Sequence, residues 1–197
     1  MDNLFLVGPS RAGKSMLARK IVEVNGAELV DIGQIARLTA PAEDKVAIDA
    51  GGLSARGDKG IEWVNDIVAR ALNPVRPSVI VGFPRTMDQL RFLLKHCAEN
   101  KLLTYRIICV LASSKVLRMR SRDGRSDMGD KVLDAKHQAF YQLLNEMWPY
   151  VNQFVSTEFY PTPEGYAALA RMIICPNYKP SDGMSPMTED LNVPDSR

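Results

Sequence analysis

The sequence predicts a three-layer α/β fold in which a five-stranded, mostly parallel sheet is covered by helices on both faces. Segments with strand character alternate with segments with helix character along the 197 residues. The strand segments are nearly continuous apolar runs, which indicates burial on both faces of the sheet. The first strand also leads through a glycine-containing loop into a helix, which is the order that a phosphate-binding loop requires.

The strands are predicted from short apolar runs at residues 4–7, 27–32, 78–81 and 105–111, with a last short strand at 154–156. The helices are predicted where apolar residues recur at every third or fourth position, at 14–24, from 33 to just beyond 37, and at 61–72, 87–97, 113–120, 131–148 and 163–173. Stop signals mark several helix ends, namely Asn25-Gly26, Pro41, Asn73-Pro74 and Pro149.

The composition is that of an ordinary globular protein, with 46% hydrophobic and 24% charged residues. The net charge of +2 gives no global basic field, so we expect no direct binding to nucleic acid. No apolar run approaches the length of a membrane span, and the first strand begins too early to leave room for a signal peptide. We therefore expect a cytoplasmic protein that makes no use of a membrane.

The cysteines and histidines argue against a metal centre built from these residues. The three cysteines are far apart and odd in number, which indicates free thiols in a reducing compartment. The two histidines, His96 and His137, are too few for a histidine site, and we expect both on helix surfaces.

The length favours one domain, at residues 1–174, followed by a tail of different character at 175–197. The tail has four prolines and few bulky apolar residues, so we expect it to be extended or disordered in isolation. Two interpretations stay open: a passive tail, or a docking arm for a protein partner.

The most informative motif is the P-loop, residues 8–15, which fits the pattern G-x-x-x-x-G-K-[ST]. Gly8 and Gly13 permit unusual backbone angles, so that N–H groups of the loop can point at phosphate oxygens. Lys14 supplies a positive charge for the β- and γ-phosphates, and Ser15 offers a hydroxyl to Mg²⁺. The alternative is a simple glycine turn with an exposed lysine and serine, which nothing else in the sequence favours.

Three further segments should meet the P-loop in space, because ligands of parallel α/β sheets bind at the carboxyl ends of the strands. Asp31 ends the second predicted strand, Gly82 to Arg85 follow the third, and the segment after Ser113 follows the fourth.

These segments carry a resemblance to a known family. After the P-loop the chain reads DIGQIAR at 31–37, IDAGGLS at 48–54, VIVGFPRTMDQ at 79–89 and RDGRSD at 122–127, in that order. The set resembles the short-lid nucleoside monophosphate kinases of the adenylate kinase family, over residues 1 to about 173. The resemblance implies ATP and Mg²⁺ as cofactors, nucleotide substrates, an acceptor-binding arm at 38–75 and a short lid at 118–130.

The resemblance also implies a role for individual residues. Those that would bind ATP are Gly8, Arg11, Ala12, Gly13, Lys14, Ser15 and Met16. Those that would bind the acceptor are Gly33, Arg37, Leu53, Gly82, Arg85, Gln89 and Lys136. Those that would stabilise charge on the transferred phosphoryl group are Lys14, Arg85, Arg118, Arg122 and Arg125. Such enzymes act mainly by positioning the two substrates and neutralising the charge on the phosphate oxygens. Arginine suits these places because its planar fork binds phosphate oxygens in pairs.

The chain departs from the family at positions that matter for metal binding. Val81 replaces the acid that precedes GFPR in the family, Met128 replaces the second lid aspartate, and Arg11 stands where the family prefers glycine. We hypothesise that Asp31 takes over part of the missing acid's role, so that Ser15 and Asp31 hold the metal, as in the similar arrangement of shikimate-kinase-like proteins. The alternative is that Asp31 only caps the helix that follows it.

Three functions therefore remain open. The first is phosphoryl transfer from ATP to a nucleoside monophosphate or deoxynucleotide. The second is a nucleotide-binding scaffold with weakened catalysis, and the third is a P-loop kinase for another small molecule. Gln89 favours adenine as the acceptor base, whereas the short lid favours the UMP/CMP-type branch, so the sequence does not decide the base.

Overall fold

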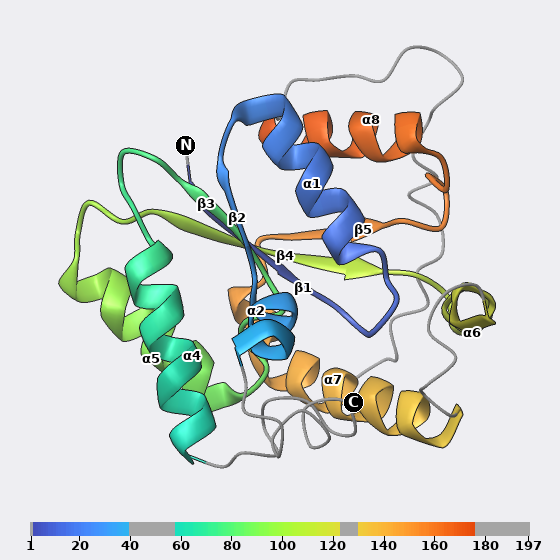
Figure 1. Ribbon diagram of the computed structural model, residues 1–197, viewed down its shortest axis with the longest axis horizontal. Helices are drawn as coiled ribbons and strands as arrows, with labels where there is room; N and C mark the ends of the chain where they lie inside the picture. Colours follow the sequence, from blue (N-terminus) through green and yellow to red (C-terminus); the bar gives the residue numbers. More distant parts are fainter. Residues whose placement is uncertain (1, 40–57, 123–129, 176–197) are drawn as a thin grey trace.

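The computed structural model describes residues 2–39, 58–122 and 130–175 (Figure 1). Its centre is a five-stranded sheet in the order β2-β3-β1-β4-β5, in which every neighbouring pair is parallel. The strands are β1 (Asn3–Val7), β2 (Glu28–Asp31), β3 (Ser78–Val81), β4 (Tyr105–Leu111) and β5 (Gln153–Ser156). The predicted fold class is confirmed, and all five strands lie within or beside their predicted ranges.

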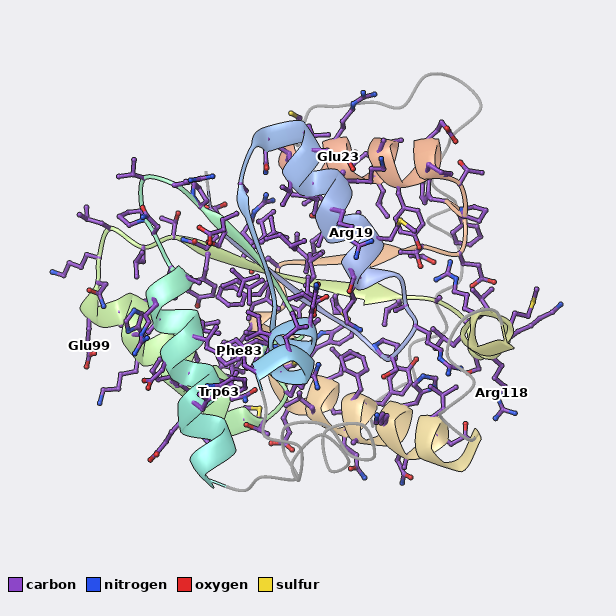
Figure 2. The ribbon with its side chains drawn as sticks, in the orientation of Figure 1. Arg19, Glu23, Trp63, Phe83, Glu99 and Arg118 are labelled. Carbon is purple, nitrogen blue, oxygen red and sulfur yellow. The ribbon has the colours of Figure 1, made fainter. Side chains whose placement is uncertain are left out.

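Helices cover both faces of the sheet (Figure 1). One face is covered by α1 (Lys14–Asn25) and α8 (Pro163–Ile174), and the other by α2 (Ile32–Thr39), α4 (Asp58–Ala71), α5 (Met87–Glu99) and α7 (Asp130–Met147). The short helix α6 (Ser114–Arg122) follows β4 at the edge of the molecule. The charged side chains of Arg19 and Glu23 extend from the outer surface of α1 (Figure 2).

Successive residues of the central strand β1 pack into two separate hydrophobic cores, one on each face of the sheet. Leu4 and Leu6 of β1 pack in the core beneath α1 and α8, whereas Phe5 and Val7 pack in the core on the opposite face. Because successive strand residues point to opposite faces, a strand that is buried on both faces must be apolar throughout. This explains the continuous apolar runs in the sequence.

Two of the element boundaries that differ from the predictions have a clear physical cause. The second strand ends at Asp31 and α2 begins at Ile32, because a carboxylate oxygen of Asp31 accepts the Gln34 backbone N–H at 3.0 Å and so caps the helix. The long helix α7 ends at Met147, and the 3-10 turn η2 (Trp148–Tyr150) follows because Pro149 cannot continue the helix.

Several predictions fall on residues that the structure does not describe, namely residues 40–57 of the acceptor-binding arm, 123–129 of the lid and nearly all of the tail at 175–197. Cys97, Cys109 and Cys175 are free, and the first two are buried. Among the described residues, no helix combines the length and the apolar character that crossing a membrane demands.

Candidate functional site

The P-loop joins β1 to α1 at the carboxyl edge of the sheet. Its backbone is left-handed at Arg11 (φ 69°) and Gly13 (φ 86°), and Gly8 has a φ of 150°. A Cβ atom on Gly8 would collide with the carbonyl oxygen of Val110, and one on Gly13 would collide with the Tyr166 hydroxyl. Both glycines are therefore required by space as well as by backbone angle.

Every carbonyl from Gly8 to Gly13 has a hydrogen-bond partner. Lys14 Nζ donates to the Gly8 and Pro9 carbonyls at 2.8 and 2.7 Å, and the Leu17 N–H donates to Gly13 at 3.0 Å. The other three carbonyls are held by side chains from distant parts of the chain: Ser10 by His137 Nε2 (3.1 Å), Arg11 by Arg120 Nη1 (3.3 Å) and Ala12 by Thr157 Oγ1 (2.7 Å). Since carbonyl and N–H point in opposite directions across a trans peptide, the Arg11 N–H points away from His137, whereas the Ala12 N–H donates to the Pro9 carbonyl at 3.3 Å within the loop.

Lys14 is held in a strongly perturbed electrostatic environment. Desolvation, followed by repulsion from the Arg85 guanidinium, lowers the pKa of Lys14 from 10.5 to about 7, although the Asp31 carboxylate opposes the shift. A lysine in this state gains charge when a polyphosphate arrives, since phosphate oxygens favour the ammonium form.

Ser15 and Asp31 are in direct contact. The Ser15 hydroxyl donates to Oδ2 of Asp31 at 2.8 Å, while Oδ1 of Asp31 accepts the Gln34 N–H. Asp31 also pairs in register with Val81 on the neighbouring strand, as expected from the sequence. The carboxylate thus caps α2 and at the same time faces the P-loop hydroxyl, so the capping interpretation holds without excluding a metal role.

The segment after β3 forms a small self-contained network. The Arg85 side chain donates through Nε to the Gly82 carbonyl at 2.9 Å, and the Arg85 backbone N–H donates to Oε1 of Gln89 at 2.7 Å. Gln89 is only 3% exposed. Because a backbone N–H can only donate, the orientation of this amide is fixed, and its NH₂ group remains as a donor.

Two arginines of α6, Arg118 and Arg120, have side chains that point in different directions. Arg118 is largely exposed at the outer edge of the molecule and bonds to Asp134 of α7 at 3.3 Å (Figure 2). Arg120, which the sequence analysis did not select, instead reaches the P-loop and also donates to the side chain and carbonyl of Thr157 at 2.9 and 3.0 Å. Residues two apart on a helix point about 200° away from each other, so only one of the two can face the loop.

His137 is the second residue that the sequence analysis missed. It lies on α7 as expected, but it is half-buried and contacts the P-loop. The helical spacing of the sequence could have indicated both residues. Arg120 follows the buried Leu117 by three positions, and His137 follows the buried Leu133 by four, so each lies on the same helix face as a buried leucine. Each therefore shares the inward face of its helix.

The structure describes some of the remaining predicted site residues and not others. Gly33 and Arg37 lie on α2, Met16 is exposed on α1, and Lys136 is half-buried on α7 beside His137. Leu53 and Arg125 lie outside the described residues, as does the side chain of Arg122. A pocket of about 240 Å³ adjoins the Asp31 side of the site and is lined by Leu29, Asp31, Gln34, Ile35 and Leu38.

The strand order and the P-loop after β1 together define the fold of the P-loop kinases. A solved shikimate kinase from Acinetobacter baumannii in complex with shikimate has this fold, with a TM-score of 0.56 and 18% sequence identity over 91% of this chain and 96% of that chain. The likeness establishes the architecture of this chain.

Sequence relatives are adenylate kinases. The chain is 33% identical to that of Pyrococcus abyssi over 90 residues, which are 45% of this chain and 41% of the relative. It is 31% identical to that of Thermotoga petrophila over 116 residues, which are 55% of this chain and 52% of the relative. The chain thus matches about half the length of these curated relatives, and no protein-family model matches it. These likenesses support a P-loop kinase without singling out one family of them.

Proposed function

We propose that the protein transfers the γ-phosphoryl group of Mg²⁺-bound ATP to a nucleoside monophosphate or deoxynucleotide. The observation that carries the proposal is the 2.8 Å hydrogen bond between Ser15 and Asp31, next to Lys14 of the P-loop. The bond brings a hydroxyl and a carboxylate together close to the P-loop lysine, and this supports the proposal because such loops bind the β- and γ-phosphates and their Mg²⁺ with groups of these kinds.

The residues of this site fit a magnesium ion. Mg²⁺ prefers oxygen ligands and usually keeps waters and substrate phosphates in its shell, so a few protein oxygens suffice. Ser15 and Asp31 would hold it, and in the described part of the chain no group of three or more histidine, cysteine, aspartate or glutamate side chains forms a closed metal site. When bound, the ion neutralises charge on the phosphate oxygens.

The chain's own residues supply the rest of the chemistry. On nucleotide binding, Lys14 exchanges the carbonyls of Gly8 and Pro9 for phosphate oxygens, and the N–H groups of the P-loop donate to the same phosphates. Arg85 donates to the Gly82 carbonyl and is close enough to Lys14 to lower the pKa of that lysine. Its guanidinium group binds the phosphate of the acceptor through two parallel N–H donors.

A nucleoside monophosphate is the preferred acceptor because of the GFPR segment and the adenylate kinase relatives. The orientation of Gln89 changes the expected base, however. Its oxygen already accepts from the Arg85 N–H, so the NH₂ group is the part of the amide that is more readily offered to a base. An oxo group on the base suits these donors better than the amino group of adenine.

A second candidate acceptor is a small polar molecule such as shikimate. The position of Asp31 at the end of the second strand favours it, because shikimate-kinase-like proteins resemble this arrangement, and so does the likeness of fold. Retention of GFPR and Gln89 weighs against it.

The test is ADP formation from ATP and Mg²⁺ with a panel of ribo- and deoxyribonucleoside monophosphates and with shikimate, with Lys14→Ala measured alongside. We expect turnover with one or two monophosphates that Lys14→Ala abolishes. Turnover with shikimate alone would overturn the nucleotide acceptor. ATP binding without turnover on any acceptor would leave a nucleotide-binding scaffold, and the tail at 175–197 would then be the place to look for a protein partner.

A further inference from the structure

Arg11, in the middle of the P-loop, has an unfavourable backbone conformation. Arg11 has a φ of 69°, which glycine adopts freely and a residue with a side chain adopts at a cost. Such a conformation persists only where the surrounding structure holds it in place. Some feature of this chain must therefore fix the backbone on both sides of Arg11.

Two side chains from outside the loop do so. The peptide planes that meet at the Arg11 Cα atom are those of Ser10–Arg11 and Arg11–Ala12. His137 holds the carbonyl of the first plane at 3.1 Å, and Arg120 holds the carbonyl of the second at 3.3 Å. Because each plane is rigid, fixing its carbonyl also fixes the N–H on its other side. The Ala12 N–H also donates to the Pro9 carbonyl at 3.3 Å, which closes a turn within the loop. The two side-chain contacts hold this turn, and with it the φ and ψ angles of Arg11, from outside.

Each of the two side chains is itself firmly placed. Arg120 makes two further hydrogen bonds to Thr157, which is fully buried and holds the neighbouring Ala12 carbonyl. His137 is half-buried on α7, and the carbonyl it faces requires that its Nε2 carry the proton. The loop is thus braced from α6, from α7 and from the segment after β5.

We propose that His137 and Arg120 are positioning residues that hold Arg11 in its left-handed conformation and so orient the Arg11 N–H group for a bound polyphosphate. The inference rests on the proposed nucleotide-binding function of the P-loop. It assigns no contact with the reacting atoms to either residue.

The proposal makes a prediction that a merely structural role does not. If the two side chains serve to hold an unfavourable conformation, they should matter less when residue 11 adopts that conformation freely. Glycine at this position removes the cost, so the effect of losing His137 or Arg120 should depend on which residue stands at 11.

The experiment measures the binding of ADP and of inorganic pyrophosphate by titration calorimetry, with thermal unfolding of every variant as a check on folding. We expect His137→Leu and Arg120→Ala each to weaken binding about tenfold, the range expected when a hydrogen bond to a partly buried carbonyl is lost. In the Arg11→Gly background the same changes should weaken binding about twofold or less. His137→Gln, which keeps an N–H donor, should recover much of the affinity.

The outcomes are distinguishable. Equal losses in the two backgrounds, or full affinity in folded His137→Leu and Arg120→Ala, would overturn the positioning role while leaving the P-loop as a nucleotide site. If the unaltered protein bound neither ADP nor pyrophosphate, the proposed function would fail, and this inference with it.

Discussion

Ser15 and Asp31 are joined by a hydrogen bond of 2.8 Å that connects the P-loop to the end of the second strand. The second oxygen of the same carboxylate caps α2 through the Gln34 N–H. Asp31 lies in register beside Val81, the position where the resembling kinases carry an acid. One carboxylate therefore has both a structural contact and a contact suited to metal binding, and substitution can separate the two.

We predict that Asp31→Asn abolishes the second role and keeps the first. Asparagine caps helices about as well as aspartate, so the free energy of unfolding should change by less than about 1 kcal/mol. Mg²⁺-dependent turnover should fall by about 10- to 100-fold, because the amide carries no charge for the ion. Asp31→Ala is the control, since it loses the cap as well and should cost about 1 kcal/mol of stability. Undiminished turnover in Asp31→Asn would rule out the metal role.

Lys14 should take up a proton when nucleotide binds. Its pKa of about 7 in the free protein leaves it mostly neutral above that pH, and bound phosphates favour the ammonium form. Binding of ADP should therefore take up nearly one proton at about pH 8.5 and far less at about pH 6, so affinity falls as the pH rises above about 7. Calorimetry in buffers of different ionisation enthalpy measures this uptake.

The control for this prediction is Lys20→Met, which removes a lysine on the surface of α1 that pairs with Glu23. Its proton uptake should equal that of the unaltered protein, and uptake near zero at the higher pH would contradict the prediction. The same pKa shift affects folding with the opposite sign. Between about 7 and 10.5 the unfolded lysine keeps a proton that the folded one has lost, so through this group the free protein becomes more stable as the pH rises.

The sequence was sufficient to predict the parts of the site that depend on local pattern. The strand–loop–helix order around Lys14, the parallel sheet and the approach of Asp31 to the P-loop follow from apolar runs and from the rule that strand ends converge. Each of these depends on residue type and order along the chain, which the sequence displays directly.

The sequence did not predict the contacts that depend on the rotation of a helix about its axis. Selecting Arg120 required knowledge of which face of α6 meets a loop that precedes it by more than a hundred residues. The contact of His137 with Ser10 is equally remote in sequence. Both residues were missed because a basic residue on a helix is more often solvated than engaged, and because their partners are backbone carbonyls, which no sequence motif encodes.

Gly13→Ala should destabilise the protein far more than Gly26→Ala, although both glycines are left-handed, with φ of 86° and 70°. A methyl group on Gly26 has open space, so only the backbone cost of about 1 kcal/mol applies. A methyl group on Gly13 also meets Tyr166, which adds an overpacking cost of about 1 to 3 kcal/mol. Urea unfolding measures the difference.

Tyr166→Phe tests whether that side chain causes the extra loss. Removing the hydroxyl should recover part of the stability in the Gly13→Ala protein, but ring carbons at 3.1 and 3.3 Å from the added methyl group would still crowd it. Equal destabilisation by Gly13→Ala and Gly26→Ala would mean that the loop can move away from α8.

Gln89 should affect both stability and the choice of acceptor, and two substitutions separate these effects. Gln89→Leu leaves the Arg85 N–H without its acceptor in a buried place, so we expect a loss of about 1 to 3 kcal/mol in the free energy of unfolding. Gln89→Glu keeps an oxygen for that N–H but replaces the amide donors with acceptors, which suit an amino group on the base. Relative kcat/KM should therefore shift toward AMP and CMP and away from UMP and GMP by about tenfold, the discrimination expected when a site's hydrogen-bonding pattern is reversed. Steady-state kinetics with these acceptors measures the ratio, and a ratio left unchanged in a folded Gln89→Glu protein would show that Gln89 stabilises the turn after β3 without facing the base.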